Sequence, residues 1–210
     1  GSEGGALATG AIAVAEGYGG TGTRSWMTGG GGADVYAAMV RTSGEGPRGI
    51  SCLLVDAASP GLRAAPPERK MGANSSPTAQ LIFDDVLVSS DRLIADEGAG
   101  FTVALAALGA GRLGIAACSV GLAQAALDAA VAYAGTRQQF GRPIADFQGV
   151  SFMLADMATA VAGARALYLQ AARLKDAGLP FGTEAAMAKL MASDAVMRVT
   201  TDAIQVFGGA

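Results

Sequence analysis

The feature that most constrains the fold is a change of sequence texture near residue 97. Before it, glycine is dense, and short apolar runs such as residues 50–55 and 80–83 lie between turn residues. Short apolar runs with this spacing are typical of the strands of a β-barrel or sandwich. After residue 97 the chain is rich in Ala and Leu and has few turn residues. The two halves therefore belong to different structural classes.

Three helices are predicted in the second half, over residues 101–135, 148–176 and 183–207. In the last two, apolar residues recur at three- and four-residue steps. Helices that are apolar around most of their circumference are buried on several sides, as in a bundle. The sequence thus predicts an α+β chain of two domains. One is a β-barrel over residues 1–97, and the other is an α-helical bundle over residues 98–210.

The balance of residue types predicts an assembly that hides apolar surface between subunits, because hydrophobic residues make up 51% of the chain and charged residues only 16%. The longest uncharged helical runs, residues 98–111 and 113–127, fall short of the roughly 18 residues that a membrane span needs, so we expect no membrane span. No amino-terminal signal pattern is visible, and we expect a cytoplasmic protein.

Charge and residue content also exclude several kinds of site. A net charge of −3 argues against a nucleic-acid partner, whose phosphates demand basic surfaces. The chain contains no histidine, which removes Ser-His-Asp triads, Cys-His pairs and histidine-based metal sites. Cys52 and Cys118 are too few for a disulfide framework or a zinc site. We therefore expect no metal, and chemistry that comes from carboxylates, Lys, Tyr or a cofactor.

Two glycine patterns match the dinucleotide-binding motif G-x-G-x-x-G, at residues 17–22 and 44–49. The phosphate-binding mechanism requires such a loop to follow a strand and open a helix, and neither pattern does so. In a chain with 31 glycines, two chance matches are unsurprising. Both are predicted to be hairpin turns.

Two other segments carry residues suited to a nucleotide cofactor. Trp26 is the only tryptophan, and with Thr28 it would share one face of a regular strand. It is either a core or interface residue or a ring that stacks on a planar cofactor beside a hydroxyl. Arg137 and Arg142 follow the first helix, where their positive charges either interact favourably with the negative end of the helix dipole or bind pyrophosphate. Gln205 with Gly208 and Gly209 either ends the third helix or lets backbone approach a nucleotide.

Taken together, these segments resemble the acyl-CoA dehydrogenase family over nearly the whole chain. The resemblance rests on several motifs in the same order as in the family. They are Ser25-Trp26-Met27-Thr28, Ala33-Asp34-Val35-Tyr36, Arg48-Gly49-Ile50-Ser51, Lys70-Met71-Gly72, Leu81-Ile82-Phe83-Asp84-Asp85-Val86, Gly111-Arg112 through Asp128, Arg137-Gln138-Gln139-Phe140-Gly141, Phe147-Gln148, and Gln205 through Gly209.

The resemblance implies a fold with a helical first domain, a middle β-barrel and a four-helix bundle, of which the first domain and the fourth helix would lie outside this chain. It also implies a flavoprotein of fatty acid metabolism and β-oxidation. FAD would desaturate an acyl-CoA between Cα and Cβ and pass the electrons to electron-transferring flavoprotein. The family assembles as a homotetramer with FAD sites shared between subunits.

Site residues follow from the same resemblance. Trp26, Met27 and Thr28 would bind the flavin ring, with Trp26 against its face and Thr28 at its N5/O4 edge. A neighbouring subunit would contribute a second group to FAD, namely Arg137, Gln139, Phe140, Phe147, Gln148, Gln205, Gly208 and Gly209. Arg112 would hold the CoA moiety, and Ser2 would lie in the flavin and acyl-CoA loop if it is native.

The catalytic base is expected beyond Ala210, so no catalytic residue is named within the chain. Part of the family instead carries a Glu at the position of Gly111. Two alternatives to acyl-CoA dehydrogenation stay open: a related flavin oxidase or monooxygenase acting on a carrier-bound or non-CoA substrate, and a non-catalytic member or fragment of the same fold.

Overall fold

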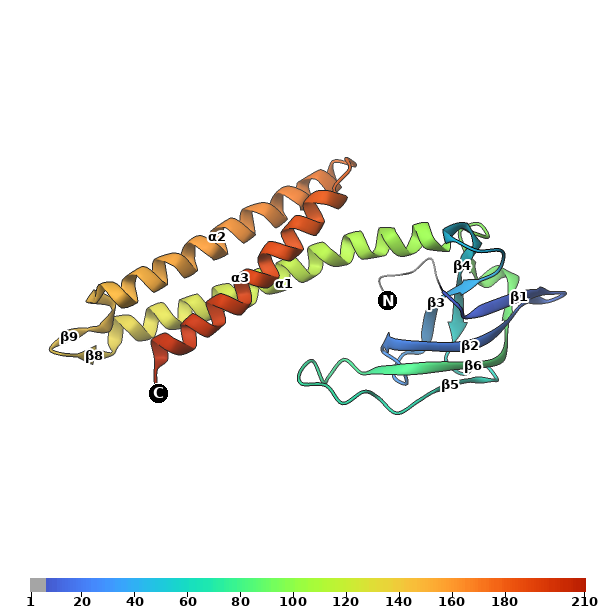
Figure 1. Ribbon diagram of the computed structural model, residues 1–210, viewed down its shortest axis with the longest axis horizontal. Coiled ribbons are helices and arrows are strands. Elements are labelled where there is room, and N and C mark those ends of the chain that lie inside the picture. Colours follow the sequence, from blue (N-terminus) through green and yellow to red (C-terminus); the bar gives the residue numbers. More distant parts are fainter. Residues whose placement is uncertain (1–6) are drawn as a thin grey trace. The chain divides into compact units, whose positions relative to one another are not determined.

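A computed structural model describes residues 7–210 (Figure 1). The predicted contact residue Ser2 lies outside the described residues. The chain divides into two compact units, a β unit of residues up to Ala106 and a helical unit of residues from Ala107 on. The first residues of helix α1 belong to the β unit and the rest of the helix to the helical unit. Gly100, at the start of α1, packs closely on strand residue Ser51, since a Cβ added to Gly100 would lie 2.4 Å from the Ser51 backbone.

The first unit is a seven-stranded mixed sheet (Figure 1). Its spatial order is β5-β6-β2-β1-β3-β4-β7. Neighbouring strands are antiparallel except β1 and β3, which meet in parallel at Gly10 and Arg41. The strands are β1 (Gly10–Val14), β2 (Gly17–Thr28), β3 (Val35–Arg41), β4 (Ile50–Asp56), β5 (Leu62–Ala64), β6 (Thr78–Ser89) and β7 (Leu93–Ile94).

Large side chains fill one core in this sheet. The buried residues include Tyr18 and Tyr36, and the largest fully buried apolar side chains lie on β3, β4 and β6. Strands from both halves of the sheet contribute, so the sheet curls around a common interior, as the prediction of a barrel requires. Within residues 7–210 its two end strands, β5 and β7, are not hydrogen-bonded to each other, so the barrel is open.

The two glycine patterns differ in structure. Residues 44–49 connect β3 to β4 through a short 3₁₀ turn, Pro47–Gly49, which confirms the predicted hairpin. Residues 17–22 are a correction: all of them lie in β2, which begins at Gly17 directly after the turn, and they pair with β1 and β6. Crowding explains two of these glycines, since a Cβ would lie 2.1 Å from the carbonyl oxygen of Val88 at Gly17 and 3.2 Å from Thr9 at Gly22. Glycine marks close backbone approach in such a strand.

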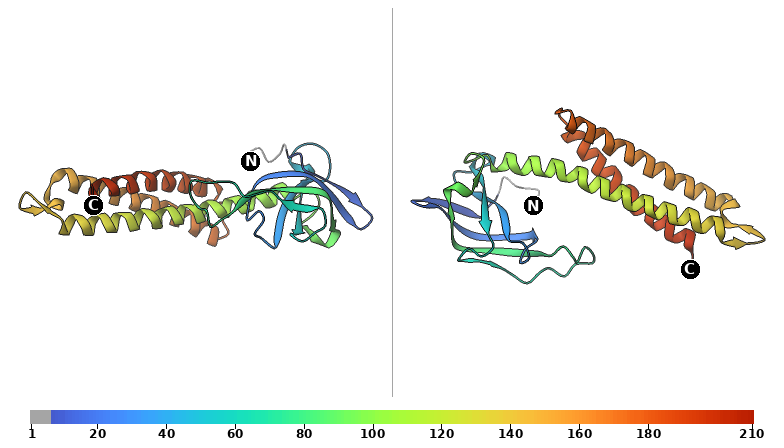
Figure 2. Two further views of the ribbon diagram at one scale, coloured as in Figure 1. Left: turned by 90° about the horizontal axis from the view of Figure 1, so that it is seen from below. Right: turned by 180° about the vertical axis from the view of Figure 1, so that it is seen from behind.

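The second unit contains the three predicted helices, side by side in both views of Figure 2. They are α1 (Gly100–Thr136), α2 (Gln148–Asp176) and α3 (Gly182–Phe207), which confirms the predicted ranges to within a residue at each end. A small hairpin of β8 (Gln138–Gln139) and β9 (Arg142–Pro143) and a 3₁₀ turn, Ile144–Asp146, join α1 to α2. Gly178 and Gly208, both with positive φ, follow α2 and α3, as is common where helices end.

Small side chains make up most of the helical core. Its buried residues are mainly alanines and valines, with Met157 and Leu127 as the larger members. By length and hydropathy alone, α1 and α2 would be long and apolar enough to cross a membrane, although each carries charged residues. Both also contribute residues to this core, and core helices need the same composition. The absence of a membrane span therefore stays a prediction.

Candidate functional site

The predicted flavin-ring segment ends strand β2. The register of β2 against β6 shifts between Arg24 and Met27, which makes a β-bulge at Ser25 and Trp26. Trp26 has a φ of 55° and is 71% exposed, while Met27 packs against the β core. The regular alternation assumed for Trp26 and Thr28 is therefore interrupted. A bulge re-aims a side chain, and here it presents an indole ring on the surface instead of in the core.

A tight turn stabilises the end of this segment. Thr28 is exposed, and the next residue, Gly29, donates its N–H to the carbonyl of Pro77 at 2.8 Å. The buried Tyr36 hydroxyl on β3 accepts the N–H of Gly31 at 3.0 Å and donates to the carbonyl of Gly29 at 3.4 Å. From the sequence, Tyr36 was predicted only as part of the motif at residues 33–36. Its hydroxyl holds the backbone that follows Trp26 and Thr28.

A second anchor lies in the loop between β5 and β6. The Lys70 ammonium donates to the carbonyls of Ala73 and Ser76, and to the Thr78 hydroxyl at 3.3 Å. Thr78 is paired with Thr28 in the β2–β6 register. The Lys-Met-Gly motif thus orders the loop beside Thr28. Met71, the next residue of the motif, is fully exposed.

The predicted nucleotide segment forms the β8–β9 hairpin at the end of α1. Phe140 and Gly141 occupy its tip with φ values of 53° and 79°, the left-handed pair that a tight two-residue hairpin requires. The sequence predicted only a loop here. The Phe140 side chain is 91% exposed, and its ring lies edge-on to that of Phe147 at a centroid distance of 6.0 Å. The hairpin therefore presents an aromatic ring outward.

Two arginines, Arg137 and Arg142, lie close to this tip in the sequence. The Arg142 guanidinium lies 4.1 Å from the centroid of the Phe147 ring, a cation–π contact that fixes Phe147 at the start of α2. The side chains of Arg137 and Gln139 are exposed, and within residues 7–210 neither has a hydrogen-bond or ion-pair partner. Gln148 is exposed in the first turn of α2. These groups remain available to a ligand.

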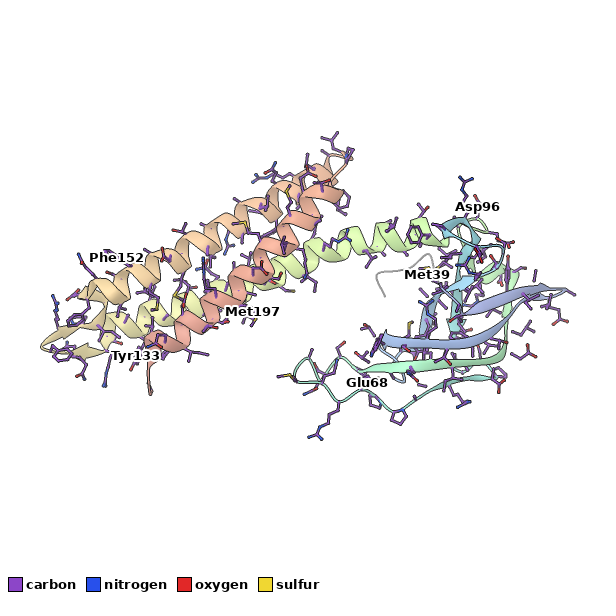
Figure 3. All side chains as sticks on the ribbon, viewed as in Figure 1. Met39, Glu68, Asp96, Tyr133, Phe152 and Met197 are labelled. Atoms are coloured by element: carbon purple, nitrogen blue, oxygen red, sulfur yellow. The ribbon has the colours of Figure 1, made fainter. Side chains whose placement is uncertain are left out.

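The structure brings the third predicted segment to the same end of the helical unit. The ring of Tyr133, near the end of α1, lies 4.7 Å from the ring of Phe207 on α3. The backbone carbonyl of Tyr133 accepts the N–H of Arg137 at 2.8 Å. Figures 1 and 3 show the hairpin, Tyr133 and the carboxyl end of α3 at one end of the unit. Gln205, Gly208 and Gly209 therefore lie at the same end as Arg137.

Two predicted positions on α1 lie away from this end. Arg112 is half-buried and precedes Arg137 by 25 residues, which is roughly 37 Å of helix. Gly111 is exposed, and a Cβ added there would meet no atom within 4 Å. Gly109, two residues earlier, is buried, and a Cβ added there would lie 3.7 Å from the Phe181 ring. A carboxylate would therefore fit at position 111 without displacing a neighbour.

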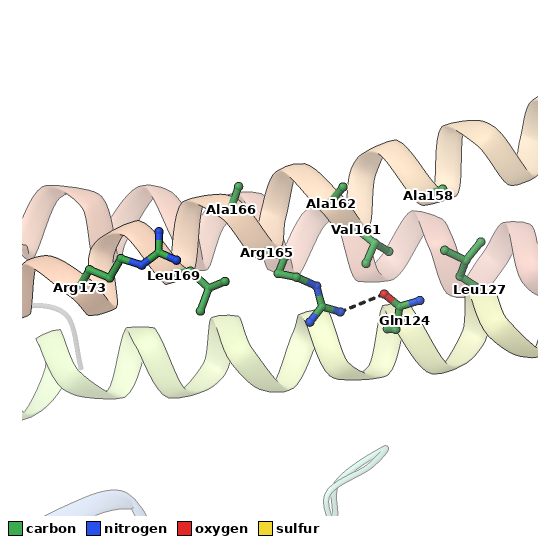
Figure 4. Close-up of a pocket in the computed structure, with 9 residues that line it drawn as sticks. All are labelled: Gln124, Leu127, Ala158, Val161, Ala162, Arg165, Ala166, Leu169 and Arg173. Atoms are coloured by element: carbon green, nitrogen blue, oxygen red, sulfur yellow. Dashed lines mark hydrogen bonds between the residues drawn. The ribbon is translucent and has the colours of Figure 1, made fainter. Parts of the chain in front are cut away.

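An open cavity of about 580 Å³ lies between α1 and α2 (Figure 4). Arg165 donates to the Gln124 side-chain oxygen at 2.9 Å across it. Alanines line one wall, with Leu169 and Arg173 at one end. None of the predicted site residues lines this cavity. The residues predicted to bind a nucleotide thus lie on exposed surface, in the β unit around Trp26 and in the helical unit around Arg137.

Comparisons with known proteins agree with these motifs. The model of the acyl-CoA dehydrogenase C-terminal domain matches residues 98–210, and that of the acyl-CoA dehydrogenase middle domain matches residues 1–86. An acyl-CoA dehydrogenase of Bacillus subtilis is 47% identical over 100% of this chain and 55% of its own length. The chain spans about half the length of the curated relatives it matches.

Solved structures show the same fold. The butyryl-CoA dehydrogenase of Megasphaera elsdenii matches with a TM-score of 0.95 and 41% identity, over 100% of this chain and 55% of that one. A chain in a structure described as an electron transferring flavoprotein of Acidaminococcus fermentans matches with a TM-score of 0.92 and 45% identity. That match covers 97% of this chain and 54% of the other.

Proposed function

The chain belongs to the acyl-CoA dehydrogenase family, and we propose that its protein oxidises a saturated acyl-CoA thioester to the trans-2-enoyl-CoA with FAD as cofactor. Members of this family are FAD-dependent oxidoreductases. The observation that carries the proposal is the exposed Trp26 on a strand bulge. An aromatic side chain held outward in a left-handed conformation gains nothing for the β core, whereas it suits stacking on a planar cofactor.

The described residues fit FAD in their chemistry. Trp26 would stack on the flavin, and the exposed Thr28 hydroxyl would hydrogen-bond its edge. Arg137 and Gln139 would bind the pyrophosphate, since a guanidinium donates two parallel hydrogen bonds to phosphate oxygens. Phe140 and Phe147 offer aromatic faces beside them, and the Gln205–Gly209 segment lies at the same end. When bound, FAD supplies the hydride-accepting chemistry.

The chain's own residues bind and orient, and the proton-abstracting base is proposed to lie outside them. Gly111 leaves the alternative base position without a side chain. Arg112 would bind the CoA moiety. Oxidation at Cβ then depends on a carboxylate beyond Ala210 that removes the α-proton while the hydride leaves.

Other parts of the proposal concern the whole protein. Electron-transferring flavoprotein is proposed as the electron acceptor, supported by the match to a chain in a structure described under such a protein's name. Several copies, in a tetramer, are proposed to share the FAD sites. The support is that the Arg137 group faces outward and that the chain carries many exposed apolar side chains. A cytoplasmic location remains the proposal drawn from the sequence.

The test uses the full-length protein. Anaerobic titration with saturated acyl-CoA thioesters is expected to bleach the flavin absorbance and to form 2-enoyl-CoA. Trp26→Ala is expected to weaken FAD binding roughly tenfold, the equivalent of about 1.4 kcal/mol. Ile12→Ala is the matched control, because Ile12 is a 75% exposed apolar side chain on the same sheet with no predicted flavin contact. A protein that binds FAD but is reduced by no acyl-CoA would contradict the proposal.

A further inference from the structure

The ammonium of Lys70 is bound by neutral oxygens. It donates to the carbonyl of Ala73 at 2.9 Å, to the carbonyl of Ser76, and to the Thr78 hydroxyl at 3.3 Å. These contacts use all three N–H groups that a lysine offers. Within residues 7–210 no carboxylate lies within ion-pair distance of Lys70. The positive charge of this half-buried side chain is therefore held in one place and is not neutralised by a described neighbour.

The same contacts place this charge beside the end of β2. Lys70 belongs to the loop that joins β5 to β6 (Figure 1), and Thr78 is the first residue of β6. Backbone hydrogen bonds fasten the loop here: Glu68 donates to the carbonyl of Thr78 at 2.7 Å, and Gly29 donates to that of Pro77 at 2.8 Å. Lys70 thus closes the loop at the point where β6 meets the end of β2.

Thr78 connects the ammonium to Thr28. The two threonines are directly opposite each other in the antiparallel register of β2 and β6. Side chains of opposite residues lie on the same face of a sheet, with Cβ atoms about 4.5–5.5 Å apart. The Thr78 hydroxyl, which accepts from Lys70, therefore lies on the same face as the Thr28 side chain. The positive charge is one side chain removed from Thr28.

A positive charge at this place acts on a flavin through the product of its reduction. Thr28 is the residue proposed to hydrogen-bond the flavin edge. Two-electron reduction adds two electrons and one proton to the neutral flavin ring, which leaves the ring with one negative charge. A nearby cation stabilises this anion more than the neutral oxidised ring, and charge near the ring is one means by which a protein tunes a flavin. A cation beside Thr28 therefore favours the reduced state.

We propose that Lys70 is a positioning residue for the flavin, which fixes the Thr28–Thr78 pair and keeps an unneutralised positive charge beside it, so that the reduction potential of bound FAD is raised. The inference rests on the proposed binding of FAD at Trp26 and Thr28. It goes beyond the proposed reaction, because it concerns how readily the cofactor accepts electrons and not which substrate supplies them.

Ordering of the loop without any effect of charge is the competing explanation for Lys70. Two substitutions separate the explanations. Lys70→Gln removes the charge and keeps an amide that donates to carbonyls, whereas Lys70→Arg keeps the charge and changes the geometry of the donors. If the charge acts on the flavin, the arginine variant behaves like the wild type and the glutamine variant does not.

The preceding residue provides a matched control. Arg69 is exposed, and within residues 7–210 its side chain has no hydrogen-bond or ion-pair partner. Arg69→Gln removes the same charge from the same loop. Water and salt screen an exposed charge of this kind, so this variant is expected to keep the wild-type reduction potential.

The test is a potentiometric titration of FAD bound to the full-length protein, with a chemical reductant and without acyl-CoA. Lys70→Gln is expected to lose roughly tenfold in the ratio of its affinities for reduced and oxidised FAD, which lowers the potential of a two-electron couple by about 30 mV. Lys70→Arg is expected to keep the wild-type potential. A variant that binds FAD too weakly for potentiometry is measured by titrating its apoprotein separately with oxidised and reduced FAD, because the ratio of the two dissociation constants gives the same shift.

Three outcomes would overturn the inference. An unchanged potential in Lys70→Gln would show that the charge does not act on the flavin. An equal fall in Lys70→Arg would show that the geometry of the loop is responsible and the charge is not. An equal fall in Arg69→Gln would show a general effect of net charge.

The proposed reaction and this inference fail separately. A protein whose FAD potential depends on Lys70, but whose FAD is reduced by no acyl-CoA, would contradict the proposed reaction and leave the role of Lys70 standing. A protein whose FAD is reduced by acyl-CoA, but whose potential is the same in Lys70→Gln, would overturn only the role of Lys70. A wild type that binds no FAD would contradict both.

Discussion

The two units use apolar side chains in opposite ways. In the β unit large side chains such as Tyr36, Leu53, Leu81 and Phe83 are buried and pack inside the curled sheet. In the helical unit the buried residues are mostly Ala and Val, while Leu, Met and Ile side chains lie on the outside. The β unit thus completes its core within one chain. The helical unit packs its backbones closely and leaves its larger apolar surface for other contacts.

The first prediction tests the core of the β unit, where we expect the largest effect. Leu53→Ala removes a side chain that is 1% exposed on β4, and deletions of this kind cost about 2–5 kcal/mol. Hydrogen exchange of peptides from the β unit would measure the loss. Leu54→Ala is the control, because Leu54 is only half-buried on the same strand. Equal losses at both positions would contradict the difference in burial between Leu53 and Leu54.

The second prediction concerns the inner face of α3. Ala188 is fully buried, and Ala188→Leu forces extra methylenes between closely packed helices. Overpacking of this kind typically costs about 1–3 kcal/mol. Thermal unfolding and hydrogen exchange of helical peptides would detect it. Ala186→Leu, the same change at an exposed position of α3, is expected to have little effect, and a similar loss there would indicate loose packing.

A third, smaller effect concerns the glycines of α1. Gly111 lies in the helix interior with open space around its missing Cβ. Gly111→Ala is therefore expected to stabilise the helical unit by about 1 kcal/mol, the difference in helix propensity between the two residues. Reduced hydrogen exchange in the surrounding peptides would be the measurement. A destabilised Gly111→Ala helix would show that the surroundings of this position are more crowded than described.

The smallest effect is a pH dependence in the β unit. Burial raises the pKa of the Cys52 thiol above its ordinary value of about 9. Above pH 9 the Cys52 thiol therefore ionises in the unfolded state before it ionises in the folded state. The contribution of this thiol to the free energy of unfolding is present below pH 9 and is lost as the pH rises towards the folded-state pKa. Above pH 9 the urea midpoint of Cys52→Ala is expected to fall less steeply with pH than that of the wild type. Cys118→Ala, at an exposed position, should retain the wild-type slope.

Local sequence signals were enough for the helices and too weak for the site segment on β2. The range of α1 followed from its Ala- and Leu-rich composition, and those of α2 and α3 from apolar residues at three- and four-residue steps. Residues 17–22 were predicted to form a turn because glycine favours turns, yet they are strand residues, and close contacts require glycine at Gly17 and Gly22. The bulge at Trp26 was also missed, since it exists only in the register between β2 and β6.

The sequence by itself determined the two-part organisation, the helices, the absence of histidine chemistry and the family to which the motifs belong. These depend on residue types and on spacing within one segment. Only the tertiary structure decided that Trp26 faces outward, that Tyr133 joins the Arg137 hairpin to the end of α3, and that the large side chains of α3 lie outside the bundle. The physical reason is that register, helix rotation and burial are set by contacts between segments distant in the chain.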